Sequence, residues 1–245
     1  MDYFGITDRG KVRKDNQDCF LMEPQREGER LVVALCDGMG GTRAGGIASD
    51  VAAKSFVAFV GERLSEGGDR PAPYGAILKG ACSEANGVVY QYSCYDAGYS
   101  GMGTTLVGGI IMPDSAVVTN VGDSRCYHIT GGGITQVTRD HSLVEEMVRR
   151  GEITREAARR HPRKNIITNA LGLEQGVTAD VFEIVLARGD WLLFCSDGLS
   201  NELEDAELLS AAQNSVSPKA LCRALLDLAL ARACPDNVTA VAVRA

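Results

Sequence analysis

The sequence lacks the features that mark secreted and membrane-spanning proteins. Its first residues, MDYFGITDRGKVRKD, are charged and contain no apolar stretch of the kind that a signal peptide requires. The longest apolar runs, LVVALC and WLLFC, are far too short to cross a bilayer. We therefore expect a cytoplasmic protein that does not bind a membrane.

The eight cysteines include no CxxC pair. A zinc site needs thiolates or histidines that cluster in the sequence, and the spacings here do not supply such a cluster. Cys36, Cys126 and Cys195 lie inside apolar stretches. We predict reduced, buried thiols rather than zinc ligands or disulfides.

Histidine is also scarce, with three residues, and no GxSxG motif occurs. Serine–histidine–aspartate hydrolase chemistry is therefore disfavoured. We expect His128 to pack within a strand and His161 to lie in a solvated loop. His141, in the sequence RDHS, is left open between a structural role and a role in a site.

Excess positive charge is absent as well. The net charge is −7, and 45% of the residues are hydrophobic against 23% charged, which is typical of a globular protein. Nothing in the sequence requires the basic face of a nucleic-acid binder, so we expect no nucleic-acid partner. The 245 residues contain no linker or repeat, and we predict one domain, 1–245.

Hydrophobic patterning predicts strands in runs and helices in pairs. The strands are expected at 2–8, 18–23, 31–36, 104–112, 115–121, 124–130, 133–139, 181–186, 191–196 and 238–243, and the helices at 45–64, 77–92, 203–213 and 217–233. Residues 67–73 are expected to form a loop, and the charged segment 142–164 a helical surface excursion that moves. This order indicates a layered α+β fold rather than βαβ alternation.

Five aspartates stand at the ends or turns of apolar segments: Asp18, Asp37, Asp123, Asp197 and Asp236. A single Asp-Gly is a common turn dipeptide, so Asp37-Gly38 alone would carry little weight. The repetition at several strand ends is what suggests a shared site. Carboxylate oxygens are the ligands that Mg²⁺ and Mn²⁺ prefer. We predict that these aspartates gather around two cations, which would bridge a water and lower its pKa.

Arg13 precedes Asp18 in the sequence RKDNQD. It is either a solvated turn residue or a guanidinium that holds two oxygens of a phosphate. The neighbouring Lys11 and Lys14 do not discriminate between these alternatives.

Taken in order, eight segments resemble the PPM, or type 2C, family of metal-dependent protein phosphatases in its compact bacterial form. They are GKVRKDNQD (10–18), ALCDGMGG (34–41), GMGTTL (101–106), NVGDSR (120–125), RDHSLVEEMVRRGEIT (139–154), NIITNALG (165–172), LLFCSDGL (192–199) and PDNVT (235–239). The resemblance implies an α+β fold built as a four-layer α-β-β-α sandwich, in which two antiparallel sheets are flanked by pairs of helices.

The resemblance also implies an enzyme that hydrolyses phosphoserine and phosphothreonine in proteins, with two Mn²⁺ or Mg²⁺ ions per site and a third, weaker one. Asp37 would bridge two ions, and the carbonyl of Gly38 would bind one of them. Asp18, through water, would complete this centre with Asp197 and Asp236.

Further roles come from the same resemblance. Asp123 would hold the third ion together with Asp197, Arg13 would bind the substrate phosphate, and 142–168 would be a mobile flap. A metal-bridging hydroxide would attack phosphorus in line, without a phosphoenzyme. The implied partners are phosphorylated proteins, including a Ser/Thr kinase whose autophosphorylation the enzyme would reverse, and we expect a monomer.

Three residues depart from the family pattern. Met39 stands where many eukaryotic members have the histidine assigned as general acid, which leaves a metal-bound water as the candidate acid. Asn169 replaces an arginine usual in bacterial members, which would remove a charge near the site entrance. Gln17 replaces a common glutamate and would weaken metal affinity.

Two other classes of function are alternatives to a protein phosphatase. A non-catalytic binding module with this fold would be expected to have lost metal ligands, and none of the predicted ligands is missing. A two-metal nuclease is disfavoured by the acidic composition, whereas a small-molecule phosphohydrolase is harder to separate from a protein phosphatase by sequence.

Overall fold

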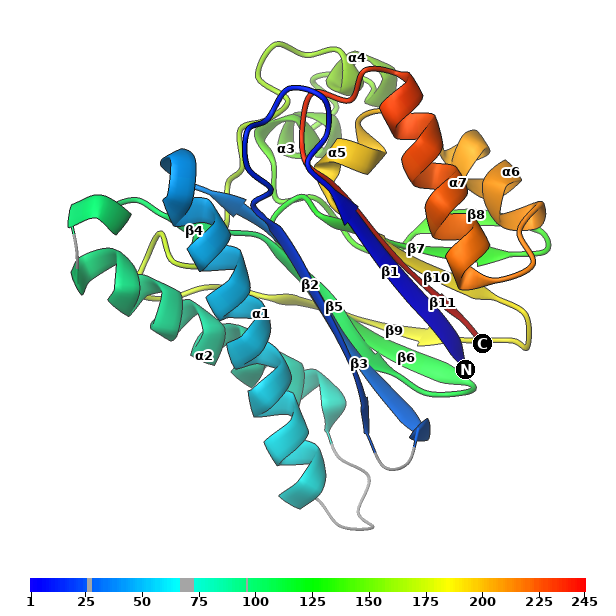
Figure 1. Ribbon diagram of the computed structural model, residues 1–245, viewed down its shortest axis with the longest axis horizontal. Coiled ribbons are helices and arrows are strands. Elements are labelled where there is room, and N and C mark those ends of the chain that lie inside the picture. Colours follow the sequence, from blue (N-terminus) through cyan, green and yellow to red (C-terminus); the bar gives the residue numbers. More distant parts are fainter. Residues whose placement is uncertain (26–27, 67–72, 96) are drawn as a thin grey trace.

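Two antiparallel β-sheets lie face to face, and a pair of helices covers each outer face (Figure 1). This arrangement is that of a computed structural model, which describes residues 1–25, 28–66, 73–95 and 97–245. The prediction of an α+β fold with two antiparallel sheets flanked by helices is confirmed.

One sheet has the strand order β2-β3-β5-β6-β9, and β4 pairs with the end of β3. Its strands are β2 (Asp18–Gln25), β3 (Arg30–Met39), β4 (Gly103–Thr104), β5 (Leu106–Ile111), β6 (Ser115–Val121) and β9 (Asp180–Val185). The other sheet has the order β1-β11-β10-β7-β8. Its strands are β1 (Asp2–Asp8), β7 (Arg125–Thr130), β8 (Gly133–Gln136), β10 (Trp191–Cys195) and β11 (Val238–Arg244).

Three apolar layers hold the four structural layers together. The helices α1 (Gly41–Glu66) and α2 (Tyr74–Tyr95) pack on the first sheet, and α6 (Asp205–Gln213) and α7 (Pro218–Ala231) pack on the second. A third cluster fills the space between the sheets. A strand in the middle of such a sandwich is buried on both faces, which explains why its sequence is apolar at every position.

Strand β3 illustrates this requirement. Successive side chains of a strand point to opposite faces. Val32, Ala34 and Cys36 contribute to the layer beneath α1 and α2, whereas the odd-numbered residues between them face the second sheet. The prediction that LVVALC forms a fully buried strand is therefore confirmed.

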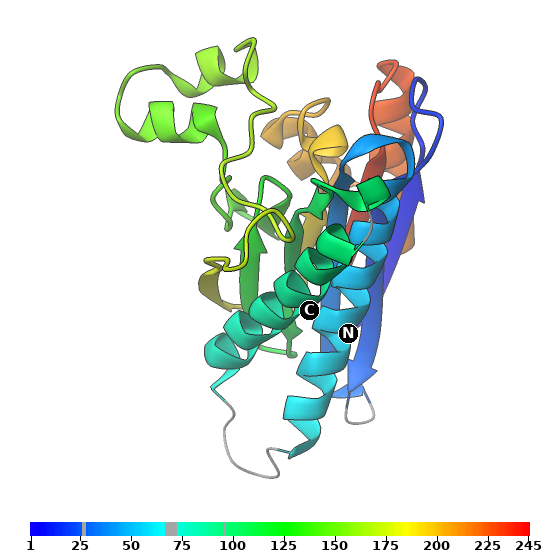
Figure 2. The same cartoon turned by 90° about the vertical axis from the view of Figure 1, so that its left-hand side faces the viewer.

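The flap segment, residues 142–168, contains two short helices, α3 (Leu143–Arg149) and α4 (Arg155–Arg159). Each helix begins at a capping hydroxyl: Ser142 accepts a hydrogen bond from the backbone of Glu145, and Thr154 accepts one from Ala157. Between the helices, Gly151 has φ +72° and allows the chain to turn. Figure 2 shows these helices standing apart from the sheets, at the upper left.

A few segments differ in detail from the sequence predictions. The strand expected at 104–112 is divided between β4 and β5, and a four-residue helix, α5 (Asp197–Ser200), was not predicted. The loop expected at 67–73 lies, except for Pro73, outside the described residues.

All eight cysteines are free thiols, and Cys36, Cys126 and Cys195 are buried as predicted. Within the described ranges, no helix has the length and apolar character needed to cross a membrane.

Candidate metal centre

Strands β2 and β3 place two of the five aspartates opposite each other, because Asp18 pairs with Asp37 in the strand register. The backbone of Asp37 is fixed by its neighbours in the chain segment after α2. Its carbonyl accepts hydrogen bonds from the Thr105 amide and the Thr104 hydroxyl, both at 2.9 Å. Its amide donates to the Thr105 hydroxyl at 3.0 Å. These bonds hold the Asp37 side chain at the edge of a cavity.

Asp18 has one satisfied oxygen and one unsatisfied oxygen. Its Oδ2 accepts hydrogen bonds from the hydroxyls of Ser196 at 2.8 Å and Thr239 at 2.6 Å. Its Oδ1 is buried and has no hydrogen-bond partner among the described residues. Burial raises the pKa of Asp18 to about 6, although the two hydroxyls act in the opposite direction. A buried oxygen of this kind is poorly solvated and suited to a cation or to water bound to one.

The second sheet supplies Asp197 and Asp236 from the ends of neighbouring strands. Asp197 follows β10 as the first residue of α5, and its Oδ2 accepts a hydrogen bond from the Asn201 side chain at 3.0 Å. Asp236 precedes β11, and its Oδ2 lies 2.7 Å from Nη2 of Arg13. Because β10 and β11 are paired, the two carboxylates approach the same end of the sheet.

A cavity of about 540 Å³ brings most of the predicted site residues together. Its lining includes Arg13, Asp37, Gly38, Asp123, Asp197 and Asp236, together with Met39 and the flap residues Asn165 and Ile167. Asp18 lies outside this lining, next to Asp37. All seven residues predicted for the site are therefore gathered in one region of the fold.

The carboxylates raise one another's pKa. Burial raises the pKa of Asp37 well above its ordinary range, and the charge of Asp18 is the next largest cause. Burial likewise raises the pKa of Asp123, with Asp197 adding to the effect. Several carboxylates in one low-dielectric region destabilise each other's charged form, and a divalent cation would reverse that effect.

The residues suit a divalent cation but are not arranged as a preformed cage. Within the described part of the chain, no group of three or more Asp, Glu, His or Cys side chains is placed to hold a metal ion directly. Asp236 is instead paired with Arg13. The all-oxygen donor set and the unsatisfied Oδ1 of Asp18 fit Mn²⁺ or Mg²⁺. A cation bound to Asp236 would require this carboxylate to exchange its arginine partner.

Arg13 is partly exposed, with 55% of its side chain accessible, and it lines the cavity while paired with Asp236. The sequence left open a solvated turn residue or a phosphate-binding guanidinium, and the structure places Arg13 at the cavity in an exposed ion pair. An arginine at the rim of an acidic cavity is placed where it could exchange a carboxylate for a phosphate, since both offer two oxygens to the guanidinium.

His141 supports the loop that carries Asp123. Its Nδ1 accepts hydrogen bonds from the Gly122 amide at 3.2 Å and from the Asn169 side chain at 3.1 Å. Two donors on Nδ1 place the ring proton on Nε2, which lies 3.3 Å from Asp180. Asn169 also donates to the carbonyl of Thr178 at 2.7 Å, so its amide braces this loop.

The other two histidines lie away from the cavity. His128 is in β7 and pairs with Asp190 at 2.8 Å, which confirms the expectation that it packs within a strand. His161 follows α4, is half-buried, and accepts a hydrogen bond from the backbone of Arg163.

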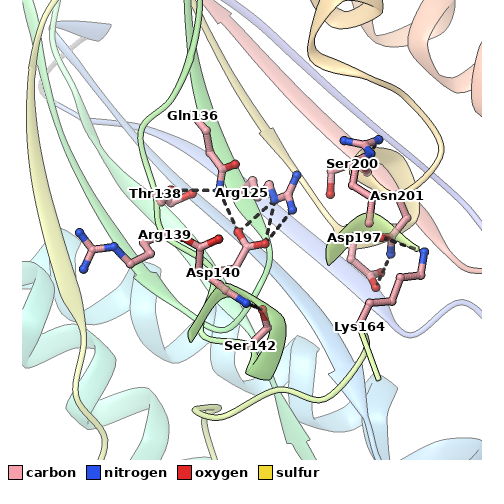
Figure 3. Close-up of polar contacts among 12 residues, drawn as sticks. Arg125, Gln136, Thr138, Arg139, Asp140, Ser142, Lys164, Asp197, Ser200 and Asn201 are labelled. Atoms are coloured by element: carbon pink, nitrogen blue, oxygen red, sulfur yellow. Dashed lines mark hydrogen bonds and ion pairs between the residues drawn. The ribbon is translucent and has the colours of Figure 1, made fainter. Parts of the chain in front are cut away.

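Sequence reasoning missed an ion pair beside the site. Arg125 donates from Nε and Nη2 to Asp140, with Nη2 at 2.7 Å, and the pair is largely buried (Figure 3). The positive charge of Arg125 lowers the pKa of Asp123 and so opposes the effect of burial. Both residues stand in segments quoted above, NVGDSR and RDHS, but their pairing depends on the β7–β8 hairpin.

Comparisons with known proteins identify the family of this chain. The family model described as protein phosphatase 2C matches residues 9–225. The serine/threonine phosphatase stp of Listeria monocytogenes serotype 4b is 37% identical over 223 residues, which cover 87% of this chain and 84% of that protein. Protein phosphatase PhpP of Streptococcus pneumoniae is 34% identical over 244 residues, covering 99% and 97%.

A solved structure adds a metal-bound relative. The catalytic domain of the serine/threonine phosphatase PstP, crystallised in complex with two manganese ions, superposes with a TM-score of 0.83 at 32% identity. The match covers 98% of this chain and 96% of that one.

Proposed function

The chain belongs to the protein phosphatase 2C family of serine/threonine protein phosphatases, and we propose that its acidic cavity hydrolyses phosphoserine and phosphothreonine with two bound divalent ions. The observation that carries this proposal is the convergence of Asp37, Asp123, Asp197 and Asp236 on one cavity that also contains Arg13.

The proposed ligands divide into two groups. Asp37 and the carbonyl of Gly38 serve the two-metal centre together with Asp197, Asp236 and, through water, Asp18. Asp123 serves a third and weaker site, shared with Asp197. The manganese complex of PstP supports two ions for that relative, and the oxygen donors here suit Mn²⁺ or Mg²⁺.

The ions, when bound, supply Lewis acidity and a hydroxide near neutral pH. The protein supplies the positioning. Ser196 and Thr239 hold Asp18 through its Oδ2. Arg13, released from Asp236, donates to the phosphate oxygens and offsets the negative charge that spreads over them in the transition state.

The cavity also limits the chemistry available to the protein. Among the described residues, its lining contains no serine, cysteine or histidine. A serine, cysteine or histidine phosphoenzyme is therefore not part of this proposal, in which water attacks the phosphate directly. Met39, at the position of the eukaryotic general acid, has no proton to give. We propose that a water donates the proton that the leaving oxygen needs.

We further propose that the substrates are phosphorylated proteins, including a Ser/Thr kinase that the enzyme counteracts. In this proposal the whole chain, 1–245, is one phosphatase domain with a mobile flap segment, acting as a monomer. The cavity opens beside Asn165 and Ile167 of that segment, which would then contact the peptide around the phosphorylated residue.

The experiment that tests this function compares phosphopeptides of one sequence phosphorylated on threonine or on tyrosine. With Mn²⁺ present, phosphate should be released from the phosphothreonine peptide, and a chelator should stop the reaction. Hydrolysis that survives chelation would contradict the proposal. A small phosphate ester hydrolysed far faster than any phosphopeptide would instead favour the small-molecule alternative.

A further inference from the structure

The flap segment is attached to the short helix that carries Asp197. Nη2 of Arg159 donates hydrogen bonds to the carbonyls of Ser200 at 3.3 Å and Leu203 at 3.1 Å. Nζ of Lys164 donates to Oδ1 of Asn201 at 3.3 Å. All three contacts end on α5 or the turn that follows it, so the flap segment holds the far end of the element that begins with Asp197.

Asn201 joins this attachment directly to the site (Figure 3). Its Nδ2 donates to Oδ2 of Asp197 at 3.0 Å, while its Oδ1 accepts from Lys164. The two contacts fix the orientation of the amide. A flipped amide would turn its oxygen toward the carboxylate and its NH₂ group toward the ammonium, and both contacts would be lost.

The positive charge of Lys164 acts on the Asp197 carboxylate. Burial raises the pKa of Asp197, and the charge of Asp236 raises it further. Lys164 is among the groups that lower it, which means that its ammonium favours the ionised carboxylate. The flap segment thus contributes to the environment of a site carboxylate without touching it.

The attachment is polar and sparse, so it can open. Val144 is the one buried residue of α3, and α4 has no buried residue. A cavity of about 200 Å³ is lined by residues of both helices together with Asp123, Asp197 and Lys164. An element held by a few polar contacts rather than by apolar packing opens at low free-energy cost.

We propose that Asn201 is a positioning residue that couples the flap segment to Asp197, with Lys164 as the contact on the flap side. The proposal rests on the proposed function, in which Asp197 is a metal ligand. Outer hydrogen bonds of this kind orient a metal-binding carboxylate and strengthen metal affinity. Coupling is reciprocal, so metal binding should in turn hold the flap segment against the core.

The test uses the full chain in four variants: Asn201→Ala, Lys164→Met, the double variant, and Arg160→Met. Arg160 is an exposed arginine of the flap segment beside Arg159, and its replacement removes the same charge from the same segment without touching Asn201. Two quantities are measured: the Kd for Mn²⁺ by calorimetry, and the hydrogen exchange of residues 142–168 with Mn²⁺ and with chelator.

We expect Asn201→Ala to weaken Mn²⁺ binding about ten-fold and Lys164→Met about two- to five-fold. The double variant should lose less affinity than the sum of the two single losses, because the hydrogen bond of Lys164 acts through Asn201 while its charge acts on Asp197 directly. Arg160→Met should bind Mn²⁺ as the wild type does. In the wild type Mn²⁺ should slow exchange in the flap segment, and this protection should be lost in Asn201→Ala.

Two results would overturn the coupling: wild-type Mn²⁺ affinity in both single variants, or losses that add fully in the double variant. If thermal unfolding shows that Asn201→Ala does not fold, the comparison of Lys164→Met with Arg160→Met decides the question, and equal affinity in those two variants counts against the proposal. Failure of the proposed function is a separate outcome, in which the wild type itself binds no Mn²⁺.

Discussion

Without divalent ions, the stability of this protein should fall as the pH rises, and Asp18 allows the effect to be worked out. Its pKa is raised from 3.8 to about 6 in the folded state, mainly by burial. An acid with a raised pKa binds its proton more tightly when folded. Its contribution to stability is therefore present below the unfolded pKa and is lost as the pH rises through about 4 to about 6.

The size of the effect follows from the pKa difference. One pKa unit corresponds to about 1.4 kcal/mol, so the full loss for Asp18 is about 3 kcal/mol. About half of it, roughly 1.5 kcal/mol, falls between about pH 5 and about pH 7.5. Asp37 and Asp123, whose pKa values are also raised by burial, change stability in the same direction.

Urea unfolding in the presence of chelator measures this contribution when the wild type is compared with Asp18→Asn. The variant cannot ionise at this position, while its amide oxygen can still accept from Ser196 and Thr239. The free energy of unfolding of the variant relative to the wild type should therefore rise by about 1.5 kcal/mol from about pH 5 to about pH 7.5. Added Mn²⁺ should stabilise the wild type more than the variant.

The reasoning would be refuted if the difference in free energy of unfolding between Asp18→Asn and the wild type did not change with pH, or changed in the opposite direction. Such a result would mean that Asp18 is already solvated or paired in the metal-free protein. It would also remove the physical argument that its unsatisfied Oδ1 suits a bound cation or water.

Three further changes should each affect a different property. Arg13→Ala should raise KM for a phosphopeptide about ten-fold or more, because a charge-assisted contact to phosphate is lost. Calorimetry should show little change in Mn²⁺ affinity, and a loss of metal affinity would refute the phosphate role. Asp123→Ala should reduce turnover and leave the two tighter ions bound, which metal analysis after gel filtration can check. Unchanged turnover would show that Asp123 has no role in the site. Arg125→Met should lower the free energy of unfolding by about 3–5 kcal/mol, because the buried Asp140 loses its counter-charge and keeps only the hydrogen bond from Gln136. Urea unfolding that matches the wild type would contradict this.

Much of the fold could be predicted because a strand that is buried on both faces has apolar residues at successive positions of its sequence. β3 and β10 are apolar at successive positions, and both lie between two apolar layers. The helix α5 has no recognisable sequence pattern, because four residues are too few to show a helical period. The flap segment was expected to be helical, but its division into two helices depends on the caps Ser142 and Thr154.

The site was predictable in its acidic residues and not in the contacts that hold them. An aspartate at a strand end can be recognised locally. The hydrogen bond from Thr239 to Asp18, however, joins residues 221 positions apart, and the pair of Arg13 with Asp236 spans 223. Such contacts depend on strand order and register, which hydrophobic patterning does not specify.

Asn169 shows the same limit. Its position in the TNALG stretch suggested a missing charge at the site entrance. The structure adds a bracing role for its amide, because it joins Thr178 to His141, whose ring accepts a hydrogen bond from Gly122 next to Asp123. Local sequence identified the position as unusual, but only the packing around His141 shows what the side chain contacts.

The central claim is that the carboxylates around this cavity hold the ions that hydrolyse phosphothreonine in proteins. The most direct test measures phosphate release from a phosphothreonine peptide against free Mn²⁺, beside calorimetric Mn²⁺ binding, for the wild type and Asp37→Asn. We predict that the wild-type rate rises with Mn²⁺ occupancy, and that Asp37→Asn folds normally but loses both tight binding and turnover. Turnover by Asp37→Asn at the wild-type rate, or by the wild type in chelator, would contradict the claim.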